Sequence, residues 1–420
     1  MLVVHASDIH LDSPMVGLER YEGCPVDAIR GATRRALAKL CDAAIEERAE
    51  LLLIAGDLYD GAWRDYATGL FFVGQMRRLR EAGIEVVMLR GNHDAESQIT
   101  KHLTLPENVH QLPTDRAGTV ELGSIGVAVH GQGFPTREVF ADLAKDYPPA
   151  RGSLFNIGLL HTALGGRPGH EPYAPTTTEL LKQKGYDYWA LGHVHHREVV
   201  LRDPFVVYPG NLQGRSVKET GPKGATFFHV EGGRVTGLEH RSVDVVRWAD
   251  ISVTADEDDA VDDVLARARV AIEGALEDAD DRLLAARLTV RGRTRAHGAI
   301  EKSEEAFAAE VRAVGLDVGG DDLWLGDVRI ETGVPLDLAA LRRQAGPIAH
   351  LLAGLDALRA EREARQPLAD VLADLRAKLP DDLLREPELR CLTEDDALAG
   401  VLDEVEQLLV ARLAVDAEEP

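Results

Sequence analysis

An apolar run over residues 84–89 ends in Arg90-Gly91-Asn92-His93-Asp94, where an amide, an imidazole and a carboxylate follow one another directly. The run has the composition and length of a buried β-strand, and Gly91 lets the backbone turn sharply where the strand ends. Ligands of open α/β sheets bind beyond the carboxyl ends of the strands. This stretch therefore predicts a polar functional site at one edge of a sheet, with further contributing residues elsewhere in the chain.

Strands and helices alternate at the start of the chain. Apolar runs predict strands at Leu2–Ala6, Leu51–Ala55 and Glu85–Leu89, and helical spacing of apolar residues predicts helices at Val26–Arg48 and Asp65–Ala82. Alternation of this kind is typical of βαβ units, which build a parallel sheet. The fold class that we expect is therefore α/β.

Short strands dominate the next part of the chain, and one clear helix, Thr177–Lys184, interrupts them. This succession predicts two packed sheets with helices on the outside. The predicted strands are Thr119–Leu122, Ile125–His130, Phe155–Leu160, Tyr188–Leu191, Phe205–Tyr208, Ala225–Val230 and Arg234–His240.

The length of 420 residues is enough for about two to three domains. Residues 1–245 contain the two predicted sheets. Residues 250–333 alternate helical and strand-like patterns and predict a small α+β domain, whereas residues 335–420 are helical by pattern between prolines. We therefore predict three domains with these bounds.

The cysteines and the start of the chain bear on location. Three scattered cysteines without CxxC spacing argue against a disulfide framework and favour a reducing, cytoplasmic setting. The chain starts with a predicted strand and shows no basic region with a cleavage site, so we expect no signal peptide. We also expect no membrane span, since no apolar run approaches about 20 residues.

The negative charge is concentrated in the second half of the chain. A net charge of −24 is unusual for a protein that binds nucleic acid. However, residues 250–420 contain 40 acidic and 20 basic side chains, whereas residues 1–249 contain 31 and 27. The charge therefore does not exclude a phosphodiester substrate for the first half.

Seven candidate metal ligands stand at the ends of five apolar runs in the first half. Alternate residues of a strand face the same side, so Asp8-x-His10 and His193-x-His195 each direct two ligands to one point. A mixed oxygen and nitrogen set of this size suits two divalent cations such as Mn²⁺ or Fe²⁺ better than one structural zinc ion. The candidates are Asp8, His10, Asp57, Asn92, His161, His193 and His195.

Structural roles are the alternative for each candidate. A histidine at a strand end is more often a hydrogen-bonded structural residue than a ligand, and Asp8 or Asp57 alone could cap a loop or turn. Five coincidences at the ends of apolar runs nevertheless favour a metal site over five unrelated roles.

The order and spacing of these motifs resemble the calcineurin-like metallophosphoesterase superfamily over about residues 1–240. Within it, the chain is similar to the bacterial DNA repair exonucleases, the SbcD-like group and especially its YhaO-like branch. The stretches that carry this similarity are Ala6–Asp12, Tyr188–His195, Tyr208–Arg215 and Glu219–Gly224.

The resemblance implies a metallophosphoesterase two-sheet sandwich flanked by helices, with residues 250–333 as a capping domain. It further implies that one metal ion is held by Asp8, His10 and His195, the other by Asn92, His161 and His193, and that Asp57 bridges them. His93 would be the catalytic general acid, oriented by Asp94. Archaeal nucleases of this group carry a second histidine three residues after the bridging aspartate, where this chain has Asp60.

Further residues are candidates for substrate and partner binding. Arg90 would pair with a substrate phosphate or with a nearby carboxylate. Asn211, Gln213 and Arg215 follow a predicted strand and would contact a nucleic-acid backbone, or form a structural turn beside the site. The apolar stripes in the C-terminal region would pack within the chain or, as the resemblance implies, dock an SMC-like coiled-coil ATPase (YhaN-like or SbcC-like).

The function that we expect is Mn²⁺-dependent DNA exonuclease or endonuclease activity in repair, with Fe²⁺, Zn²⁺ and Mg²⁺ as alternative metals. A metal-activated hydroxide would attack phosphorus while His93 protonates the leaving oxygen. Two alternatives are a phosphodiesterase or phosphatase with a small substrate, and a non-enzymatic scaffold subunit of a coiled-coil ATPase complex. The sequence leaves open the polarity of cleavage, the physiological metal, and whether the chain is a homodimer.

Overall fold

The computed structural model describes residues 1–15, 23–60, 66–96, 104–165, 171–335, 338–343, 346–360, 362–376, 378–379, 401–402, 405–406 and 409. Contacts divide the chain into two compact units. The first contains residues 1–250 together with residues 273–287 and 319–327, and the second contains the remainder. The predicted site residues all belong to the first unit.

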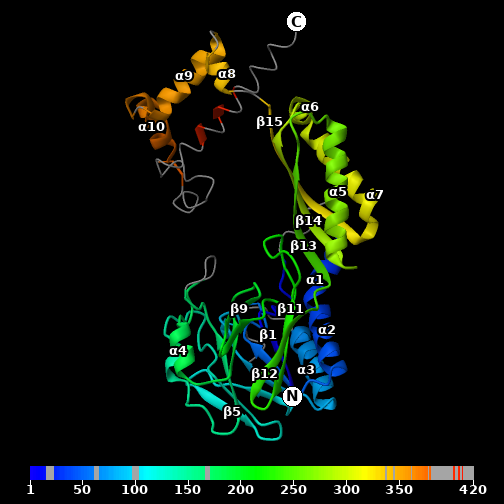
Figure 1. The fold of residues 1–420 in the computed structure, drawn as a ribbon, viewed down its shortest axis with the longest axis vertical. Coiled ribbons are helices and arrows are strands. Elements are labelled where there is room, and N and C mark those ends of the chain that lie inside the picture. The colour runs from blue at the N-terminus through cyan, green and yellow to red at the C-terminus, as the bar shows by residue number, and fades with distance from the viewer. Residues whose placement is uncertain are drawn as a thin grey trace. The chain divides into compact units, whose positions relative to one another are not determined.

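The first large sheet has the strand order β12-β11-β1-β2-β3-β4 (Figure 1). Strands β1 (Leu2–Ala6), β2 (Leu51–Ala55), β3 (Glu85–Leu89) and β4 (Val109–Gln111) are parallel. Strand β11 (Gly224–Glu231) runs antiparallel to β1, and β12 (Arg234–Ser242) runs antiparallel to β11. The predicted strands of the first hundred residues are confirmed.

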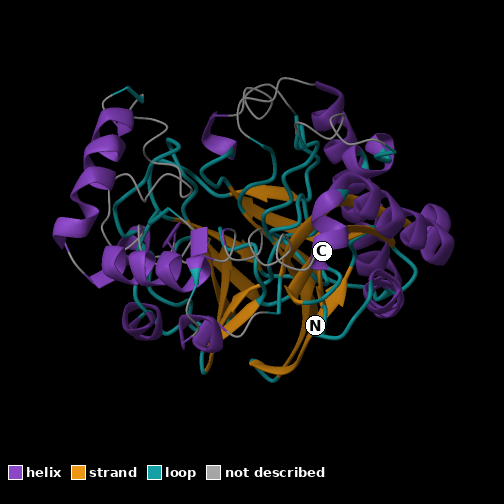
Figure 2. Ribbon diagram, turned by 90° about the horizontal axis from the view of Figure 1, so that it is seen from above, coloured by secondary structure: helices purple, strands orange, loops and turns teal. Residues whose placement is uncertain are grey.

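The second large sheet has the strand order β5-β6-β7-β8-β10-β9. Its parallel centre is formed by β6 (Val127–Gly131), β7 (Phe155–His161), β8 (Tyr188–Gly192) and β10 (Phe205–Tyr208). The edge strands β5 (Gly118–Leu122) and β9 (Glu198–Arg202) pair antiparallel with their neighbours. Figure 2 draws the strands of the chain in orange and its helices in purple.

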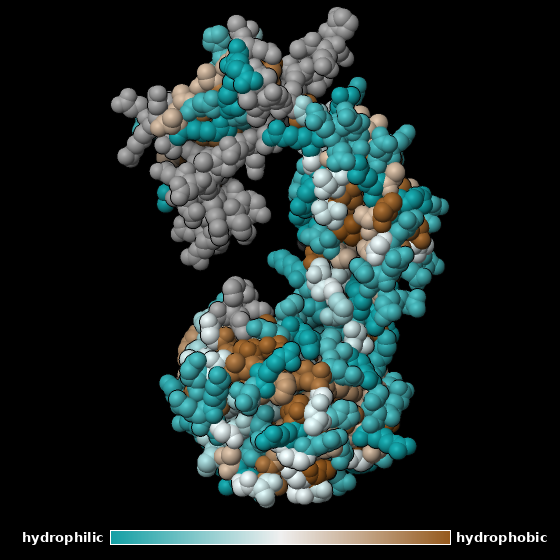
Figure 3. Space-filling model, viewed as in Figure 1, coloured by the Kyte–Doolittle hydropathy of each residue, from teal (hydrophilic) through white to brown (hydrophobic). Residues whose placement is uncertain are grey.

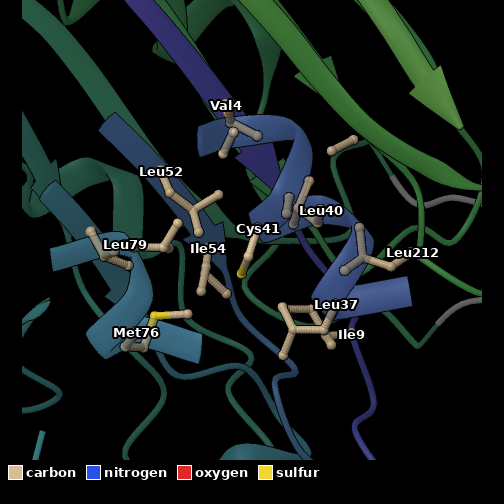
Figure 4. Packing of buried hydrophobic residues seen from close by; sticks show 14 of the residues in the cluster. Val4, Ile9, Leu37, Leu40, Cys41, Leu52, Ile54, Met76, Leu79 and Leu212 are labelled. Carbon is tan, nitrogen blue, oxygen red and sulfur yellow. The ribbon is translucent and has the colours of Figure 1, made fainter. Parts of the chain in front are cut away.

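Helices α1 (Val26–Arg30), α2 (Ala32–Glu46) and α3 (Tyr66–Glu81) follow β1 and β2. Because Leu37, Leu40 and Cys41 recur at helical spacing, α2 buries one face against the first sheet. Figure 4 shows these side chains and those of Met76 and Leu79 packed against the strands.

Two further apolar layers complete the sandwich. One lies between the sheets and includes Val3, Leu53 and Ile157. The other covers the outer face of the second sheet, where Trp189 packs near helix α4 (Thr178–Gln183) and a 3₁₀ turn at Leu143–Asp146. The predicted α/β sandwich of two sheets flanked by helices is confirmed.

A third sheet has the order β13-β14-β15. It consists of β13 (Val246–Thr254), β14 (Leu283–Arg293) and β15 (Leu323–Gly333), and its helices are α5 (Val261–Ala279), α6 (His297–Lys302) and α7 (Glu304–Gly319). Arg269 of α5 forms an ion pair with Asp317 of α7 at 2.7 Å, so these two helices lie side by side (Figure 1).

The surface of α5 and α7 is mostly hydrophilic, with a few apolar side chains. Val270 and Leu316 are 68% and 69% exposed, and brown atoms interrupt the teal surface of this region in Figure 3. Single exposed apolar residues of this kind are common on soluble surfaces.

Three C-terminal helices are described: α8 (Leu338–Arg343), α9 (Pro347–Ala360) and α10 (Arg362–Arg376). The apolar stripe of α9 buries Leu352 and Leu355 within the chain. The predicted stripe at residues 401–413 lies mostly outside the described residues. None of the helices in the described part of the chain combines the length and apolar composition of a membrane span.

Gly158 of β7 tests the packing of the second sheet. A Cβ atom there would lie 2.3 Å from Trp189 Cε3, and Trp189 is fully buried. We expect Gly158→Ala to lower the free energy of unfolding by about 1–3 kcal/mol, because overpacking forces neighbouring groups apart. Chemical denaturation followed by tryptophan fluorescence measures this change.

Gly74→Ala is the matched control. Gly74 lies on the exposed side of α3, where an added Cβ meets no atom within 4 Å. Alanine should raise helix stability there by up to about 1 kcal/mol. Equal effects of the two substitutions would contradict the packing account.

Candidate metal centre

Five strands deliver the predicted residues to one end of the sandwich. Asp8 and His10 follow β1, Asp57 follows β2, and Asn92 and His93 follow β3. His161 is the last residue of β7, and His193 and His195 follow β8. Because parallel strands of both sheets end at the same place, side chains far apart in sequence become neighbours.

Strained backbone holds several of these residues. Asp8, His10, Asp57 and His193 have φ values of 51°, 44°, 51° and 97°, in a region that residues other than glycine rarely adopt. Each such conformation costs about 1–3 kcal/mol and persists only when its surroundings enforce it. Strain of this kind clusters at functional sites.

Hydrogen bonds between loops enforce this backbone. The amide of Asp8 donates to the Gly56 carbonyl at 3.1 Å, and that of His10 donates to the Asp57 carbonyl at 3.0 Å. Gly91 lies so close to Asp57 that a Cβ atom would be 2.2 Å from its Oδ1. The site therefore requires glycine at position 91 for lack of space.

Asp8, His10 and His195 form the first group of potential ligands, whose donor atoms lie within 4.8 Å of one another. The Nε2 atoms of His10 and His195 are 3.2 Å apart, and His195 Nε2 is 3.7 Å from Asp8 Oδ1. His195 Nδ1 lies 2.7 Å from Glu219 Oε1. Since a carboxylate only accepts, Nδ1 carries the proton and the lone pair of Nε2 faces His10.

Asn92, His161 and His193 form the second group. His161 Nε2 is 2.9 Å from Asn92 Oδ1, and the rings of His161 and His193 are 5.1 Å apart. His161 Nδ1 donates to the Ala55 carbonyl, and His193 Nε2 donates to the Glu171 carbonyl, both at 2.9 Å. These bonds to carbonyls fix the tautomers and leave the opposite ring nitrogen of each histidine as the one with a lone pair.

Asp57 lies between the two groups. Its Oδ1 accepts from the backbone amide of His93 at 2.9 Å. Its Oδ2 is 3.5 Å from His161 Nε2 and 3.9 Å from His10 Nε2. One carboxylate therefore contacts a histidine of each group, which is the position expected of a bridging ligand.

The charges of the site interact strongly. Burial and the charge of Arg215 lower the pKa of His10 to about 4, and burial and His161 lower the pKa of His193 to about 4. Burial also disfavours charged His161, but the carboxylates of Asp57 and Asp8 outweigh it and raise its pKa to about 9. The acidic groups thus attract positive charge to the position that His161 Nε2 faces.

The donor atoms fit a pair of divalent cations. Carboxylate oxygens, an amide oxygen and imidazole nitrogens suit divalent metals such as Mn²⁺, Fe²⁺ or Zn²⁺. His10 Nε2 and His195 Nε2 face each other at 3.2 Å beside the Asp8 carboxylate, and a cation there would accept a lone pair from each nitrogen.

The structure corrects the role predicted for Asp94. Its buried carboxylate accepts backbone N–H groups from Leu58, Tyr59 and Gly91 at 3.2, 2.9 and 3.0 Å. Asp94 therefore joins the loops after β2 and β3 and does not orient His93. Burial and the charge of Asp57 raise the pKa of Asp94 to about 6.

Asp60, and not Asp94, contacts the ring of His93. Its Oδ1 lies 2.9 Å from His93 Nδ1, and its Oδ2 accepts from Ser13 Oγ at 2.6 Å. Burial disfavours a charged His93, but Asp60 and Asp57 outweigh it and raise the pKa of His93. One signal of this role is visible in the sequence, because Asp60 stands three residues after Asp57 in the same loop.

Two predicted substrate contacts are corrected. Asn211 and Gln213 are buried, with 0% and 1% exposure, and their side chains bond internally. Asn211 Nδ2 donates to Glu219 Oε2 and to the Gln213 carbonyl, both at 2.9 Å. Gln213 Oε1 accepts from the amides of Val245 and Val246 at 2.9 and 3.2 Å. Both residues support the structure of the loop and are not available to a substrate.

Arg215 and Arg90 are partly exposed, and their contact with a substrate stays a prediction. The Arg215 side chain is 21% exposed and lies beside the site, with NH1 3.6 Å from Asp60 Oδ2. Among the described residues, the buried Nε atoms of both arginines have no hydrogen-bond partner.

Comparisons with known proteins agree with this geometry. Residues 1–197 match the family model described as calcineurin-like phosphoesterase, and residues 248–333 match the middle domain of metallophosphoesterase YhaO. The uncharacterized metallophosphoesterase YhaO of Bacillus subtilis is 38% identical over 259 residues, which are 60% of this chain and 63% of that protein.

Two archaeal relatives are more distant. The DNA double-strand break repair protein Mre11 of Methanopyrus kandleri is 25% identical over 60% of this chain and 59% of its own length. The DNA double-strand break repair protein Mre11 of Aeropyrum pernix is 27% identical over 54% of this chain and 57% of its own length. The chain thus spans less than two thirds of the length of these relatives. With the motifs, the fold and the family matches in agreement, residues 1–197 belong to the calcineurin-like phosphoesterases and residues 248–333 to the middle domains of YhaO metallophosphoesterases.

Proposed function

We propose that the chain is a phosphodiesterase that uses two divalent metal ions to hydrolyse DNA in repair. The observation that carries this proposal is the convergence of seven potential ligands on one end of the sandwich, with the His93–Asp60 pair beside them. Asp8, His10 and His195 would hold one ion, Asn92, His161 and His193 the other, and Asp57 would bridge them.

The bound ions would supply charge neutralisation for the phosphate and activation of the attacking water. The chain's own residues orient the general acid and protonate the leaving oxygen. Asp60 fixes the His93 ring through Nδ1, so that Nε2 is free to give its proton to the leaving oxygen. Arg215 and Arg90 offer guanidinium groups to the phosphate.

DNA is the proposed substrate because the two archaeal relatives, both Mre11 proteins, are DNA double-strand break repair proteins. The charge of the first half is close to balanced, which is compatible with this substrate. Mn²⁺ is the proposed metal, since the carboxylate and amide oxygens of the donor set suit this ion.

We further propose that residues 1–245 are the nuclease domain, residues 250–333 a capping domain, and residues 335–420 a segment that docks an SMC-like coiled-coil ATPase. Val371 and Leu375 of α10 support the docking role, because they are 67% and 46% exposed and lie one turn apart. Co-purification with such an ATPase, and its loss in Val371→Asp, would test it.

The proposed function predicts Mn²⁺-dependent degradation of end-labelled duplex DNA by the full chain. EDTA should abolish the reaction, and added Mn²⁺ should restore it. Parallel assays with a small chromogenic phosphodiester separate the alternatives. Turnover of the small substrate alone would exclude a nuclease, and no turnover of either would favour a scaffold.

His93→Ala should lower kcat by about 10²- to 10⁴-fold, because the general acid is lost. Mn²⁺ binding should remain, since His93 is not among the proposed ligands. Asp60→Asn should lower kcat less, because the ring keeps an uncharged hydrogen-bond partner. Initial rates together with calorimetric Mn²⁺ titration measure both effects.

Asp94→Asn is the contrasting variant. It should lower the melting temperature, because three backbone amides lose a carboxylate acceptor. If Asp94→Asn instead lowers kcat as much as Asp60→Asn does and leaves the melting temperature unchanged, Asp94 would be the residue that orients His93.

Asp57→Ala should abolish binding of at least one metal ion, because its carboxylate contacts histidines of both groups. Metal content after dialysis against Mn²⁺ measures this loss. Full occupancy of both positions in the variant would refute the bridging role.

A further inference from the structure

The loop of residues 209–223, between β10 and β11, contacts His195 on two sides. On the ring side, Glu219 Oε1 accepts from His195 Nδ1 at 2.7 Å. On the backbone side, the His195 carbonyl accepts from Lys223 Nζ at 3.2 Å and from the Asn211 amide at 3.4 Å. Ring and backbone of one proposed ligand are thus both held by the same loop.

The position of the Glu219 carboxylate is itself fixed. Its Oε2 accepts from the Arg215 amide at 2.8 Å and from Asn211 Nδ2 at 2.9 Å. The side chain is 15% exposed, so solvent competes little for these bonds. With both oxygens engaged, the carboxylate cannot rotate without breaking bonds to the loop.

We propose that Glu219 is the positioning residue of His195, and that it sets the strength of the metal position formed by Asp8, His10 and His195. The bond to Nδ1 holds the proton there, which turns the lone pair of Nε2 toward His10 and increases its basicity. This inference rests on the proposed metal binding, but it does not depend on the substrate.

Glu219 also links this position to the proposed acid. Arg215 NH2 lies 3.4 Å from Glu219 Oε1, and its NH1 lies 3.6 Å from Asp60 Oδ2. The guanidinium is therefore held between two carboxylates, one bonded to His195 and the other to His93. Arg215 NH2 also lies 3.4 Å from His195 Nδ1, so that loss of Glu219 would leave this nitrogen beside a cation without its carboxylate partner.

Calorimetric titration of the full chain with Mn²⁺ alone tests this proposal. The wild type should bind two ions. Glu219→Ala should raise the Kd of one position by about 10- to 100-fold, the usual effect of losing an outer hydrogen-bond partner of a metal ligand, and leave the other position unchanged. Asn92→Ala should weaken the other position instead, and the double variant should weaken both.

Glu239→Ala is the matched control, because Glu239 also pairs with an arginine, Arg241, but lies on the exposed strand β12. It should bind both ions as the wild type does. Glu219→Gln should fall between wild type and Glu219→Ala, since the amide oxygen still accepts from Nδ1 whereas its NH₂ group faces the amide of Arg215. This variant also carries the test if Glu219→Ala does not fold.

Unchanged Kd values at both positions in folded Glu219→Ala or Glu219→Gln would overturn the positioning role, with the proposed function intact. An equal loss at both positions would also overturn it, because it would indicate a general disturbance. A wild type that binds Mn²⁺ tightly but degrades no DNA would refute the proposed substrate and leave the role of Glu219 standing.

Discussion

The apolar contact between the two large sheets is the constraint on which the site depends. Leu53 and Ala55 of one sheet and Leu159 and Ala190 of the other belong to one buried layer. This layer brings the carboxyl ends of five parallel strands together, although their ligands come from residues as far apart as Asp8 and His195. The centre therefore has no local origin in the chain, and a slip of either sheet would separate the ligands within each group, because each group takes residues from both sheets.

Gathering so many carboxylates and imidazoles in one place opposes folding. Four carboxylates and several imidazoles share a small volume, and four of the residues adopt left-handed backbone. The loops offset this by satisfying carboxylates with backbone amides, as Asp94 does three times and Asp8 does with His193. Two divalent cations would remove much of the remaining repulsion, so folding and metal binding should reinforce each other.

Much of this architecture was predictable from local patterns. The strands β1, β2 and β3 are continuous apolar runs, and each proposed ligand stands where such a run ends, so both the sheet and the gathering of ligands followed from simple rules. Strand β13 escaped prediction because Arg247, Asp250 and Ser252 interrupt its apolar residues. Strand β9 was not predicted because it is a half-exposed edge strand.

Side-chain roles within loops were less predictable. Asp94 is adjacent to His93 in sequence, but it turns toward the amides of the neighbouring loop, and Asp60 reaches His93 across space. Asn211 and Gln213 have the composition of ligand-binding residues, yet their polar groups satisfy buried backbone. Such choices depend on which partner the fold brings within about 3 Å, and no periodicity in the sequence encodes that.

The hydrogen bonds between the loop after β10 and the start of β13 have a practical consequence for the design of fragments of the chain. Gln213 accepts the amides of Val245 and Val246, and the Trp248 indole donates to the Gly214 carbonyl at 2.9 Å. Trp248 packs in turn against Trp324, from a strand much later in the sequence. A fragment that ends near residue 245 would lack these hydrogen bonds to the loop that holds His195. A fragment that keeps these supports should therefore extend through β15, and weak metal binding by a shorter fragment would reflect the loss of these contacts.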